Sequence, residues 1–421
     1  MRKARPKKPK IYNLTVLLER IMAKLLGVVG KPNVGKSTFF NAGTLAGAEV
    51  ASYPFTTIKA NRGMAYVKVD CPCKEQGVTC NPKNSRCLDG KRLVPIELLD
   101  VAGLVPGAHA GKGLGNQFLD DLRQADALIH IVDAAGATDD EGKPCKPGEH
   151  SPINDVRFLE KELDLWFLGL LKKNWEKMAR ALQAEQREIQ KALAEKLSGL
   201  GVAEAHISKA VRECGLDISK PASWSDSDLE KFATLLRKQS KRILICANKS
   251  DVETADRGLK ELEESGEIVV PASADSELAL RRAAEKGLIE YMPGDSDFKI
   301  KVDSGIEDKQ KQALEYIREN VLKKYKSTGV QRAIDKAVFE LLDLIVVYPV
   351  EDENKLTDKS GNVLPDAHLI PKGTTTRGLA YKIHTDIGDK FICGVDARTK
   401  RKLAADHELQ NGDIVSIQTS K

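Results

Sequence analysis

The sequence predicts an α/β protein built around a phosphate-binding loop, and three observations support this class. An apolar stretch at residues 25–29 is typical of a buried strand, the octapeptide GKPNVGKS follows at 30–37, and an apolar run compatible with a helix begins at Thr38. A strand, a glycine loop and a helix start in this order form the setting that a phosphate-binding loop requires. Further apolar stretches at 94–99 and 127–132 predict more strands of the same sheet.

The octapeptide also predicts how a nucleotide would be held. Successive backbone N–H groups in such a loop point inward and meet a helix N-terminus, which favours phosphate oxygens. We expect Lys36 to lie against the β- and γ-phosphates and the Ser37 hydroxyl to bind Mg²⁺. A chance glycine-rich turn is the alternative, and the flanking strand and helix argue against it. The residues assigned to the phosphates are Gly30, Asn33, Val34, Gly35, Lys36, Ser37 and Thr38.

Two later segments have the properties of nucleotide-sensitive switches. In the segment PFTTI, Thr57 is the residue that we expect to reach Mg²⁺ when a triphosphate is bound. The strand at 94–99 ends in DVAG, which predicts an Asp100 carboxylate in outer contact with Mg²⁺ and a Gly103 N–H at the γ-phosphate. Many GTPases follow this glycine with a glutamine that orients water, and here the residue is Leu104. We therefore expect hydrolysis to be slow, or to be assisted by another residue, a cation or a partner.

The apolar strand at 241–247 ends in the pattern NKSD, which selects the base. Asn248, Lys249 and Asp251 form an Asn-Lys-x-Asp set, whose aspartate accepts two hydrogen bonds from guanine N1 and N2. Adenine offers no such pair of donors, so the unpaired carboxylate disfavours ATP. A weaker signal is the pair Ser273 and Ala274, where a backbone N–H would meet guanine O6. The glycine loop, PFTTI, DVAG and NKSD, in this order, together predict a Ras-like G domain that binds GTP.

The composition is that of an ordinary globular protein. The 421 residues are 41% hydrophobic and 30% charged, which allows about two to four domains. No run of about 18 apolar residues occurs, so we expect no membrane span. The net charge is only +5, so any affinity for nucleic acid must come from local patches. Eight cysteines without a secretory signal point to the cytoplasm, where clustered cysteines more often bind metal than form disulfides.

The N-terminal residues MRKARPKKPK carry six basic side chains and no acid. They are interpreted either as a disordered tail or as an electrostatic arm for RNA. Met22 stands directly before the first predicted strand and offers a second start, in which case residues 1–21 are not translated.

A helical insertion is predicted between the strand ending near Asp133 and the strand at 241–247. Residues 158–200 are predicted as a long helix, and further helices are expected at 207–214 and from Ser227 onward. An apolar stripe, interrupted at Glu185, is formed by Trp175, Met178, Leu182, Ile189 and Ala192. We expect an antiparallel helical or coiled-coil arm with this stripe as its packing seam, a partner-binding face being the alternative.

Four thiols lie within seventeen residues, at Cys71, Cys73, Cys80 and Cys87. This grouping among Pro, Gly, Asn and Lys predicts a tetrahedral zinc site at the tip of a hairpin. The gap of one residue between the first two cysteines is tighter than usual, so an iron–sulfur centre and unligated cysteines stay open. The other four cysteines are isolated, and Cys246 is expected in the core.

The chain resembles the YchF/Obg-like family of P-loop NTPases, in its archaeal form. The resemblance rests on GKPNVGKSTFFN at 30–41, YPFTTIKAN at 53–61 and DVAGLVPGAHAGKGLGNQFLDDLRQADALIHIVDA at 100–134. At the C-terminus, the turn LIPKGTT, a helix near 377–384 and the ending NGDIV resemble a TGS domain, a small β-grasp module of translation-linked proteins. A basic turn in this module is formed by Arg398, Lys400, Arg401 and Lys402, and it is either a solvated turn or a patch for rRNA or tRNA phosphates.

The resemblance implies several site properties. Leu104 matches the hydrophobic residue that replaces the glutamine in the family, and Asn33 corresponds to an asparagine that helps to hold K⁺ in related cation-dependent GTPases. Many members have lost the Asn-Lys-x-Asp pattern and prefer ATP. This chain keeps it, so GTP is expected and ATP is the alternative. His130, within the strand at 127–132, is either a core histidine or a group that polarises water in place of the glutamine, and His109 is a second candidate for that role.

These observations predict a multidomain factor. Its expected parts are a basic extension at 1–21, a GTPase domain at 22–151 and 241–300 with a cysteine-rich hairpin at 71–90, an inserted helical domain at 152–240, a helical connector at 301–344 and a TGS domain at 345–421. The resemblance implies a cytoplasmic monomer that binds the ribosome through rRNA or tRNA, with no membrane or DNA partner. A nucleotide-gated RNA-binding scaffold with negligible turnover is the remaining alternative.

Overall fold

The computed structural model describes residues 24–44, 61–103, 107, 115–302 and 305–420. Its central feature is a seven-stranded sheet with the order β2-β4-β1-β5-β6-β7, in which β3 pairs with β4. Strands β4, β1, β5, β6 and β7 run parallel, whereas β2 and β3 are antiparallel to β4. Their bounds are β1 Leu25–Val29, β2 Arg62–Asp70, β3 Arg86–Leu88, β4 Lys91–Asp100, β5 Ala127–Asp133, β6 Ile243–Asn248 and β7 Val269–Pro271.

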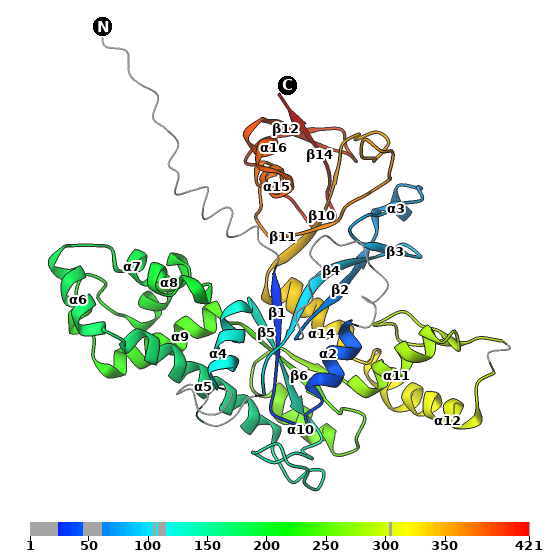
Figure 1. Cartoon of the computed structure of the whole chain (residues 1–421), viewed down its shortest axis with the longest axis horizontal. Helices are drawn as coiled ribbons and strands as arrows, with labels where there is room; N and C mark the ends of the chain where they lie inside the picture. The colour runs from blue at the N-terminus through cyan, green and yellow to red at the C-terminus, as the bar shows by residue number, and fades with distance from the viewer. Residues whose placement is uncertain (1–23, 45–60, 104–106, 108–114, 303–304, 421) are drawn as a thin grey trace.

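Helices cover both faces of this sheet, and the helical insert extends away from it on one side (Figure 1). One face packs with α2, α14 and η6 in a cluster that joins Phe39 to Ile334 and Val338, all three of them fully buried. The other face packs with α4 and with the insert, through Leu122, Leu159 and further apolar side chains. The helices around the sheet are α2 Lys36–Thr44, α4 Gly115–Gln124, α10 Ala255–Glu263, α11 Ala274–Glu285, α14 Val330–Lys336 and η6 Ala337–Leu341.

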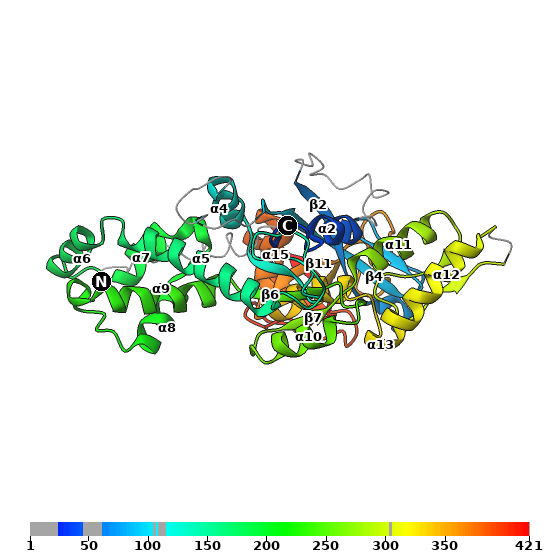
Figure 2. The same cartoon turned by 90° about the horizontal axis from the view of Figure 1, so that it is seen from below.

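The predicted connector is therefore more than a linker, because its second half completes the core beneath the sheet. Its first half forms α12 Asp308–Ile317, η5 Arg318–Leu322 and α13 Lys323–Tyr325, which pack near the two-stranded sheet of β8 Ile289–Glu290 and β9 Lys299–Ile300. Figure 2 shows α12 at the end of the molecule opposite the insert.

The helical insert differs from its prediction, because the single long helix at 158–200 does not form. The chain turns at Asn174, whose φ is +60°, and again at Gln186, whose φ is +52°. The first turn lets Trp175 stack on Trp224, with ring centroids 5.3 Å apart. The apolar stripe thus packs inside a compact bundle instead of forming a coiled-coil seam. The insert contains α5 Pro152–Lys172, α6 Trp175–Ala184, α7 Ile189–Lys196, η3 Ser198–Leu200, α8 Glu204–Cys214, η4 Pro221–Ser223 and α9 Asp226–Ser240.

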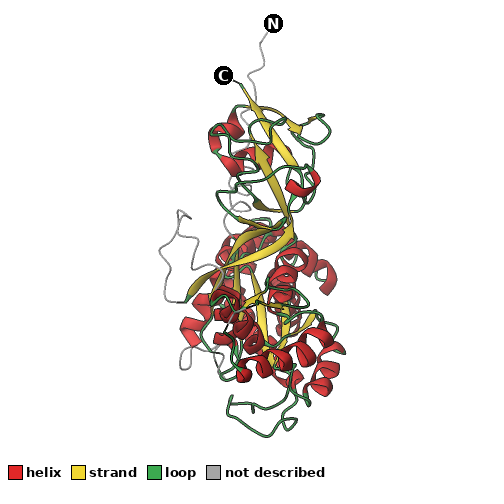
Figure 3. Ribbon diagram, turned by 90° about the vertical axis from the view of Figure 1, so that its right-hand side faces the viewer, coloured by secondary structure: helices red, strands yellow, loops and turns green. Residues whose placement is uncertain are grey.

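A second sheet of five strands forms the C-terminal domain, with the order β11-β10-β14-β12-β13. Strand β10 runs parallel to β14, whereas its pairing with β11 and the pairings of β12 are antiparallel. Helix α15 contacts β12, and Figure 1 shows α3 and β3 beside this domain. Figure 3 shows the domain at the end of the molecule that carries the C-terminus. The bounds are β10 Leu344–Val350, β11 His368–Pro371, α15 Thr376–Ile383, α16 Thr385–Asp389, β12 Phe391–Asp396, β13 Lys402–Leu403 and β14 Ile414–Thr419.

Across the described ranges, no helix is long and apolar enough to cross a membrane.

A histidine occupies the middle of the main sheet. His130 lies in β5 between Val29 of β1 and Ile245 of β6, and 1% of its surface is exposed. Burial, together with the nearby Lys31 charge, lowers the pKa of His130 to about 3. Its Nδ1 has no hydrogen-bond partner in the described part of the chain. This is the placement expected of a core histidine, the first of the two interpretations of this residue.

We predict that His130 makes the fold sensitive to acid. The folded pKa lies below the unfolded value of about 6.5, so the unfolded chain binds an extra proton as the pH falls from about 6.5 toward 3. Stability is therefore full above that window and falls by about 1.4 kcal/mol per pH unit within it. Replacing His130 by Leu should reduce the difference in melting temperature between pH 7.0 and pH 5.0. Some pH dependence will remain, because burial also lowers the pKa of His368 to about 4.

The exposed His407 provides the matched control, and His407→Asn should melt like the wild type at both pH values. A His130→Leu variant with an unchanged pH dependence of melting would contradict the prediction.

Candidate nucleotide site

The glycine loop joins β1 to α2, and two of its glycines are fixed by close contacts. Gly35 has a φ of +93°, and a Cβ placed there would lie 2.2 Å from Asn248 Nδ2. A Cβ on Gly30 would lie 2.7 Å from the Ile131 carbonyl oxygen. A side chain at either position would displace the backbone that surrounds the loop. The geometry is that of a cradle whose shape requires glycine.

The loop lysine and the strand-end aspartate contact each other directly. Lys36 Nζ donates to Asp100 Oδ1 at 2.7 Å and to the Val101 carbonyl oxygen at 2.5 Å. Ser37 is exposed in the first turn of α2, beside Lys36. The donor set fits a phosphate and Mg²⁺: backbone N–H groups at a helix start, an ammonium, a hydroxyl and a carboxylate. Phosphate oxygens would compete with Asp100 for Lys36.

Asn248 connects the glycine loop to the segment after β7. Its Nδ2 donates to the Val34 carbonyl oxygen at 2.8 Å, and its Oδ1 accepts from the Ala274 N–H at 2.9 Å. The side chain is buried at 2% exposure, so both bonds are shielded from water. The end of β6 thus holds three segments together: the glycine loop, the turn that begins at Asn248 and the segment at Ala274. The sequence predicts that each of them contacts the nucleotide.

Lys249 adopts a left-handed conformation, with a φ of +60°. Its Nζ donates to Asp133 Oδ2 at 2.8 Å, at the end of β5. Asp133 is fully buried and also accepts from the Thr138 hydroxyl at 2.8 Å. The lysine is therefore held against the neighbouring strand end, with Asp251 two residues further along the same turn.

Two tyrosines of the predicted connector support the turn at 248–251, which is predicted to recognise the base. Tyr316 and Tyr325 donate their hydroxyls to the carbonyl oxygens of Asp251 and Ser250, at 3.2 and 2.9 Å respectively. No sequence pattern marks these tyrosines, because each acts by reaching the backbone of a distant loop. They are residues whose role becomes visible only in three dimensions.

The two backbone N–H groups assigned to guanine O6 both have acceptors within the protein. Ser273 N–H donates to the Thr328 carbonyl oxygen at 2.9 Å, and Ala274 N–H donates to Asn248. For either group to meet guanine O6, its present bond must be shared or broken. The assignment of O6 to this pair stays a prediction.

Asn33 stands at the rim of the loop with a φ of +63°. Its Nδ2 donates to the Gly142 carbonyl oxygen at 2.8 Å, which fixes the orientation of the carboxamide. Asparagine tolerates this backbone region better than most residues. The K⁺ role implied by the family resemblance would fall to the other end of the carboxamide, Oδ1.

The first helix of the insert contacts both sides of the site. Lys31, in the glycine loop, pairs with Asp155 of α5 at 2.8 Å, and both side chains are buried. Burial raises the pKa of Asp155 against the opposing effects of Lys31 and His150. Further along α5, Glu162 Oε1 accepts from the Gly107 N–H at 3.1 Å. The insert is thus bonded to the phosphate loop and to the segment after Gly103.

Three predicted residues, Thr57, Leu104 and His109, lie outside the described residues. Gly103 is the last described residue of the run that follows β4, and no atom of the described residues lies within 4 Å of the point that its Cβ would occupy. His130 lies within the sheet, as described above, and so has no exposed surface from which to orient water in this conformation.

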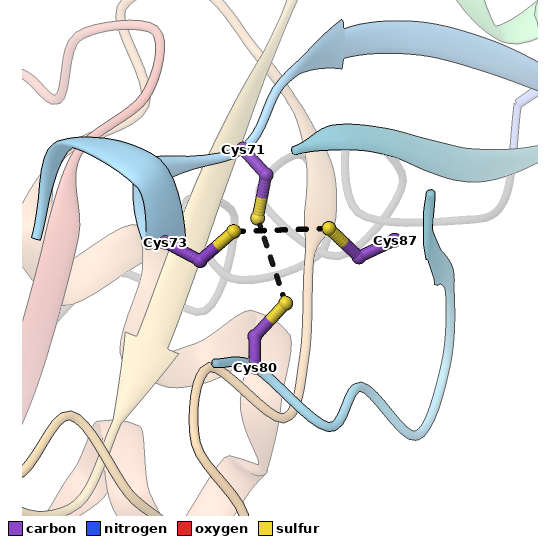
Figure 4. Close-up of side chains that lie close together, drawn as sticks. All are labelled: Cys71, Cys73, Cys80 and Cys87. Atoms are coloured by element: carbon purple, nitrogen blue, oxygen red, sulfur yellow. Dashed lines mark hydrogen bonds between the residues drawn. The ribbon is translucent and has the colours of Figure 1, made fainter. Parts of the chain in front are cut away.

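The structure brings the four clustered cysteines together (Figure 4). Cys71 Sγ lies 3.9 Å from Cys80 Sγ, and Cys73 Sγ lies 3.8 Å from Cys87 Sγ. All four sulfur atoms lie within 4.8 Å of one another. Cys246 is fully buried, as expected.

The basic turn of the C-terminal domain is partly engaged within the molecule. Arg398 forms two bonds with the Glu75 carboxylate, at 2.8 and 3.0 Å. Lys400 donates to the Glu353 carbonyl oxygen. Arg401 and Lys402 are exposed. Two of the four charges in the predicted RNA patch therefore already have protein partners.

Comparison with protein families gives three matches along the chain. Residues 25–157 match the 50S ribosome-binding GTPase family, residues 246–352 match the Obg-like GTPase YGR210-like, G4 motif-containing domain, and residues 360–419 match the TGS domain. These matches confirm the predicted P-loop G domain and the C-terminal TGS domain.

Individual relatives agree with the family matches. An uncharacterized GTP-binding protein of Methanocaldococcus jannaschii is 52% identical over 93% of this chain and 98% of its own length. A ribosome-binding ATPase YchF of Bacillus subtilis is 34% identical over 63% of this chain and 70% of its own. The crystal structure of a GTP-binding protein from Pyrococcus horikoshii has a TM-score of 0.76 and 43% identity, covering 95% of this chain and all of that one. The chain therefore belongs to the Obg-like/YchF family of P-loop GTPases.

Proposed function

We propose that this chain binds GTP in preference to ATP, hydrolyses it slowly, and changes its contacts with the ribosome as the nucleotide changes. The observation that carries the proposal is the position of Asn248, which joins the phosphate loop to the Ala274 segment and sets the turn that holds Lys249 and Asp251. This arrangement suits recognition of guanine, because the Asp251 carboxylate would accept from N1 and N2. The relatives at 52% and 39% identity are both named GTP-binding proteins, which agrees with this preference.

The phosphate side of the site would work through a few residues. The backbone around Gly35 and the Lys36 ammonium would bind the phosphates, and Ser37 and Thr57 would hold Mg²⁺, with Asp100 in its outer sphere. Bound Mg²⁺ would neutralise charge that develops on the phosphates. Gly103 N–H would meet the γ-phosphate. With Leu104 in place of a glutamine, turnover would be slow, and a cation near Asn33 would be one source of acceleration beside a partner.

The insert is the part most directly linked to nucleotide state. Asp155 and Glu162 of α5 bond to Lys31 in the phosphate loop and to Gly107 after Gly103. If the phosphate loop or the backbone at Gly107 moves when the nucleotide changes, the movement would act on the same helix, α5. We infer that α5 transmits the nucleotide state to the rest of the helical insert.

Ribosome association is the proposed outcome of this coupling. Relatives from Bacillus subtilis and Buchnera aphidicola are named ribosome-binding ATPases, which supports a ribosomal partner for this chain. The same names favour ATP as the second candidate nucleotide. The TGS domain would supply one contact, through rRNA or tRNA, and the exposed Arg401 and Lys402 are available for it.

We predict that Asp251→Asn weakens GTP binding by about 10- to 100-fold, because an amide replaces a charged acceptor of two hydrogen bonds. ATP binding, which does not use these donors, should stay within about two-fold. Isothermal titration calorimetry of the full chain with GTP and ATP measures both.

Xanthosine triphosphate gives the internal control for this variant. Xanthine carries a carbonyl at C2, to which an asparagine amide can donate, so Asp251→Asn should bind it more tightly than the wild type does. Equal affinity of the wild type for ATP and GTP would overturn the proposed preference.

Potassium is expected to accelerate phosphate release over sodium at equal ionic strength, and Asn33 is expected to be required. Asn33→Gly keeps the left-handed backbone but removes the carboxamide, so it should lose the K⁺ effect while still binding GTP. Asn33→Asp retains an oxygen ligand and should preserve part of the effect. Phosphate release measured with and without ribosomes tests both points.

If neither K⁺ nor ribosomes raises phosphate release above background in the wild type, the chain is a nucleotide-gated scaffold and not an enzyme. If Asn33→Gly keeps the full K⁺ effect, another group holds the cation.

Tryptophan fluorescence should report the coupling through α5, because all three tryptophans, Trp166, Trp175 and Trp224, lie in the insert. GTP should change the emission of the wild type. Glu162→Ala removes the acceptor of the Gly107 N–H and should abolish that change while leaving GTP affinity similar. Lys161→Ala, at the neighbouring exposed position of α5, is the control and should behave like the wild type. A full fluorescence response in Glu162→Ala would contradict the proposed route.

A further inference from the structure

The spacing of the four sulfur atoms matches one metal ion. Zn–S bonds of about 2.3 Å in a regular tetrahedron place the sulfurs about 3.8 Å apart. The sulfurs of Cys71 and Cys80 are 3.9 Å apart and those of Cys73 and Cys87 are 3.8 Å apart. The other sulfur–sulfur distances lie within 4.8 Å. The side chains converge from three segments: Cys71 and Cys73 around the start of α3 Pro72–Glu75, Cys80 from the following loop, and Cys87 from β3 (Figure 4). Their sulfurs face a common centre.

The same distances argue against a disulfide and against the iron–sulfur cluster that the sequence left open. A disulfide would bring two sulfurs to about 2.05 Å. In a [4Fe–4S] cluster each cysteine binds a different iron, and in a [2Fe–2S] cluster two cysteines bind each iron. Sulfurs on different irons have inorganic sulfide between them and are farther apart than sulfurs that share one ion. Four thiols so close to one another fit a single closed tetrahedral site, which is typical of structural zinc.

A buried arginine provides independent support. Arg92 of β4 is fully buried and pairs in register with Cys87 of β3, so both side chains lie on the same face. It donates to Ser85 Oγ and to the Leu364 carbonyl oxygen, each at 3.0 Å, whereas its Nε has no hydrogen-bond partner among the described residues. Within the described residues no carboxylate forms an ion pair with Arg92. Its charge does oppose the rise in the pKa of Asp366 that burial causes.

A fully buried guanidinium without a counter-charge is unfavourable. Four thiolates around one Zn²⁺ carry a net charge of −2, so a metal site beside Cys87 would supply the missing negative charge. Neutral thiols would not. The position of Arg92 is thus explained by metal-bound thiolates.

The cysteine-rich hairpin is also where the G domain meets the C-terminal domain. The chain between Cys80 and Cys87 donates from Asn81 N–H to the Val363 carbonyl oxygen at 3.1 Å and from Lys83 N–H to the Pro365 carbonyl oxygen at 2.7 Å. Side-chain bonds join Asn84 to both the N–H and the carbonyl oxygen of Ala367, at 2.9 and 3.1 Å.

Glu75, two residues after Cys73, forms the two bonds with Arg398 described above. Within the hairpin at 71–90, cysteines therefore flank both of these contacting segments. Cys73 and Cys80 enclose Glu75, and Cys80 and Cys87 enclose residues 81–84. An ion that fixes the four sulfurs also fixes the relative positions of these segments.

We propose that Cys71, Cys73, Cys80 and Cys87 bind one Zn²⁺ ion as a tetrahedral tetrathiolate site, and that this ion keeps the hairpin at 71–90 docked on the C-terminal domain. Zinc binding releases the thiol protons and leaves the ion with no open position. Its role is structural, and it is separate from nucleotide binding.

Elemental analysis of the purified full chain tests the metal. We expect about one zinc per chain and no acid-labile sulfide. Cys73→Ser and Cys87→Ser should each lose the zinc, whereas Cys214→Ser, which changes a cysteine in α8 of the insert, should retain it. Should either variant fail to fold, Co²⁺ exchanged into the wild type provides a second measurement, because tetrahedral thiolate coordination gives it intense visible absorption. Iron in place of zinc, zinc retained in Cys73→Ser, or a reduced wild type that takes up neither zinc nor cobalt would each overturn the proposal.

Hydrogen exchange followed by mass spectrometry tests the docking. Val363 and Ala367 donate their backbone N–H groups to Asn81 and Asn84, so peptides covering 358–367 should exchange faster in the zinc-free Cys87→Ser chain than in the wild type. Peptides covering β6 should exchange equally in both, which shows that the G domain is intact. Unchanged exchange at 358–367 after loss of zinc would show that the ion does not hold the two domains together.

Discussion

The nucleotide site depends on one buried carboxamide. Asn248 stands at the end of β6, where the carboxyl ends of the parallel strands meet, and it bonds at once to Val34 and Ala274. The contact is close enough that the neighbouring Gly35 has no room for a Cβ. The glycine loop, the turn predicted to recognise the base and the segment after β7 therefore take their positions from a single side chain. A buried polar group bonded at both ends is costly to disturb, which makes this arrangement rigid.

Short-range patterns predicted the strands and loops that surround this carboxamide. The apolar runs at 25–29 and 127–132 correspond to β1 and β5 almost residue for residue, because a strand buried on both faces is apolar throughout. The TGS domain was recognised from its turn and its ending, and family comparison confirms it. Sequence could also place Asn248 and Lys249 at a strand end, but it could not show what either side chain contacts.

What sequence missed depends on contacts between distant residues. Helical periodicity continues across Asn174, and only the stacking of Trp175 on Trp224 in the folded insert explains why the helix ends there. The sequence predicts a helical connector at 301–344, but not that its second half completes the core or that Tyr316 and Tyr325 bond to the turn at 248–251. The sequence also gives no sign that Arg398 of the basic turn pairs with Glu75, which is more than 300 residues earlier in the chain.

The bond between Lys36 and Asp100 has a consequence for how the site fills. Asp100 cannot orient fully toward a hydrated metal while it holds the ammonium, and Lys36 cannot turn toward phosphate while it is held. Phosphate that draws Lys36 away frees the carboxylate, and a metal that draws Asp100 away frees the ammonium. Each ligand thus removes the obstacle to the other, and by thermodynamic reciprocity the two must favour each other's binding equally. With the proposed roles of Lys36 and Asp100, a metal-free nucleotide would have to displace the carboxylate alone, so the pair would favour the magnesium complex.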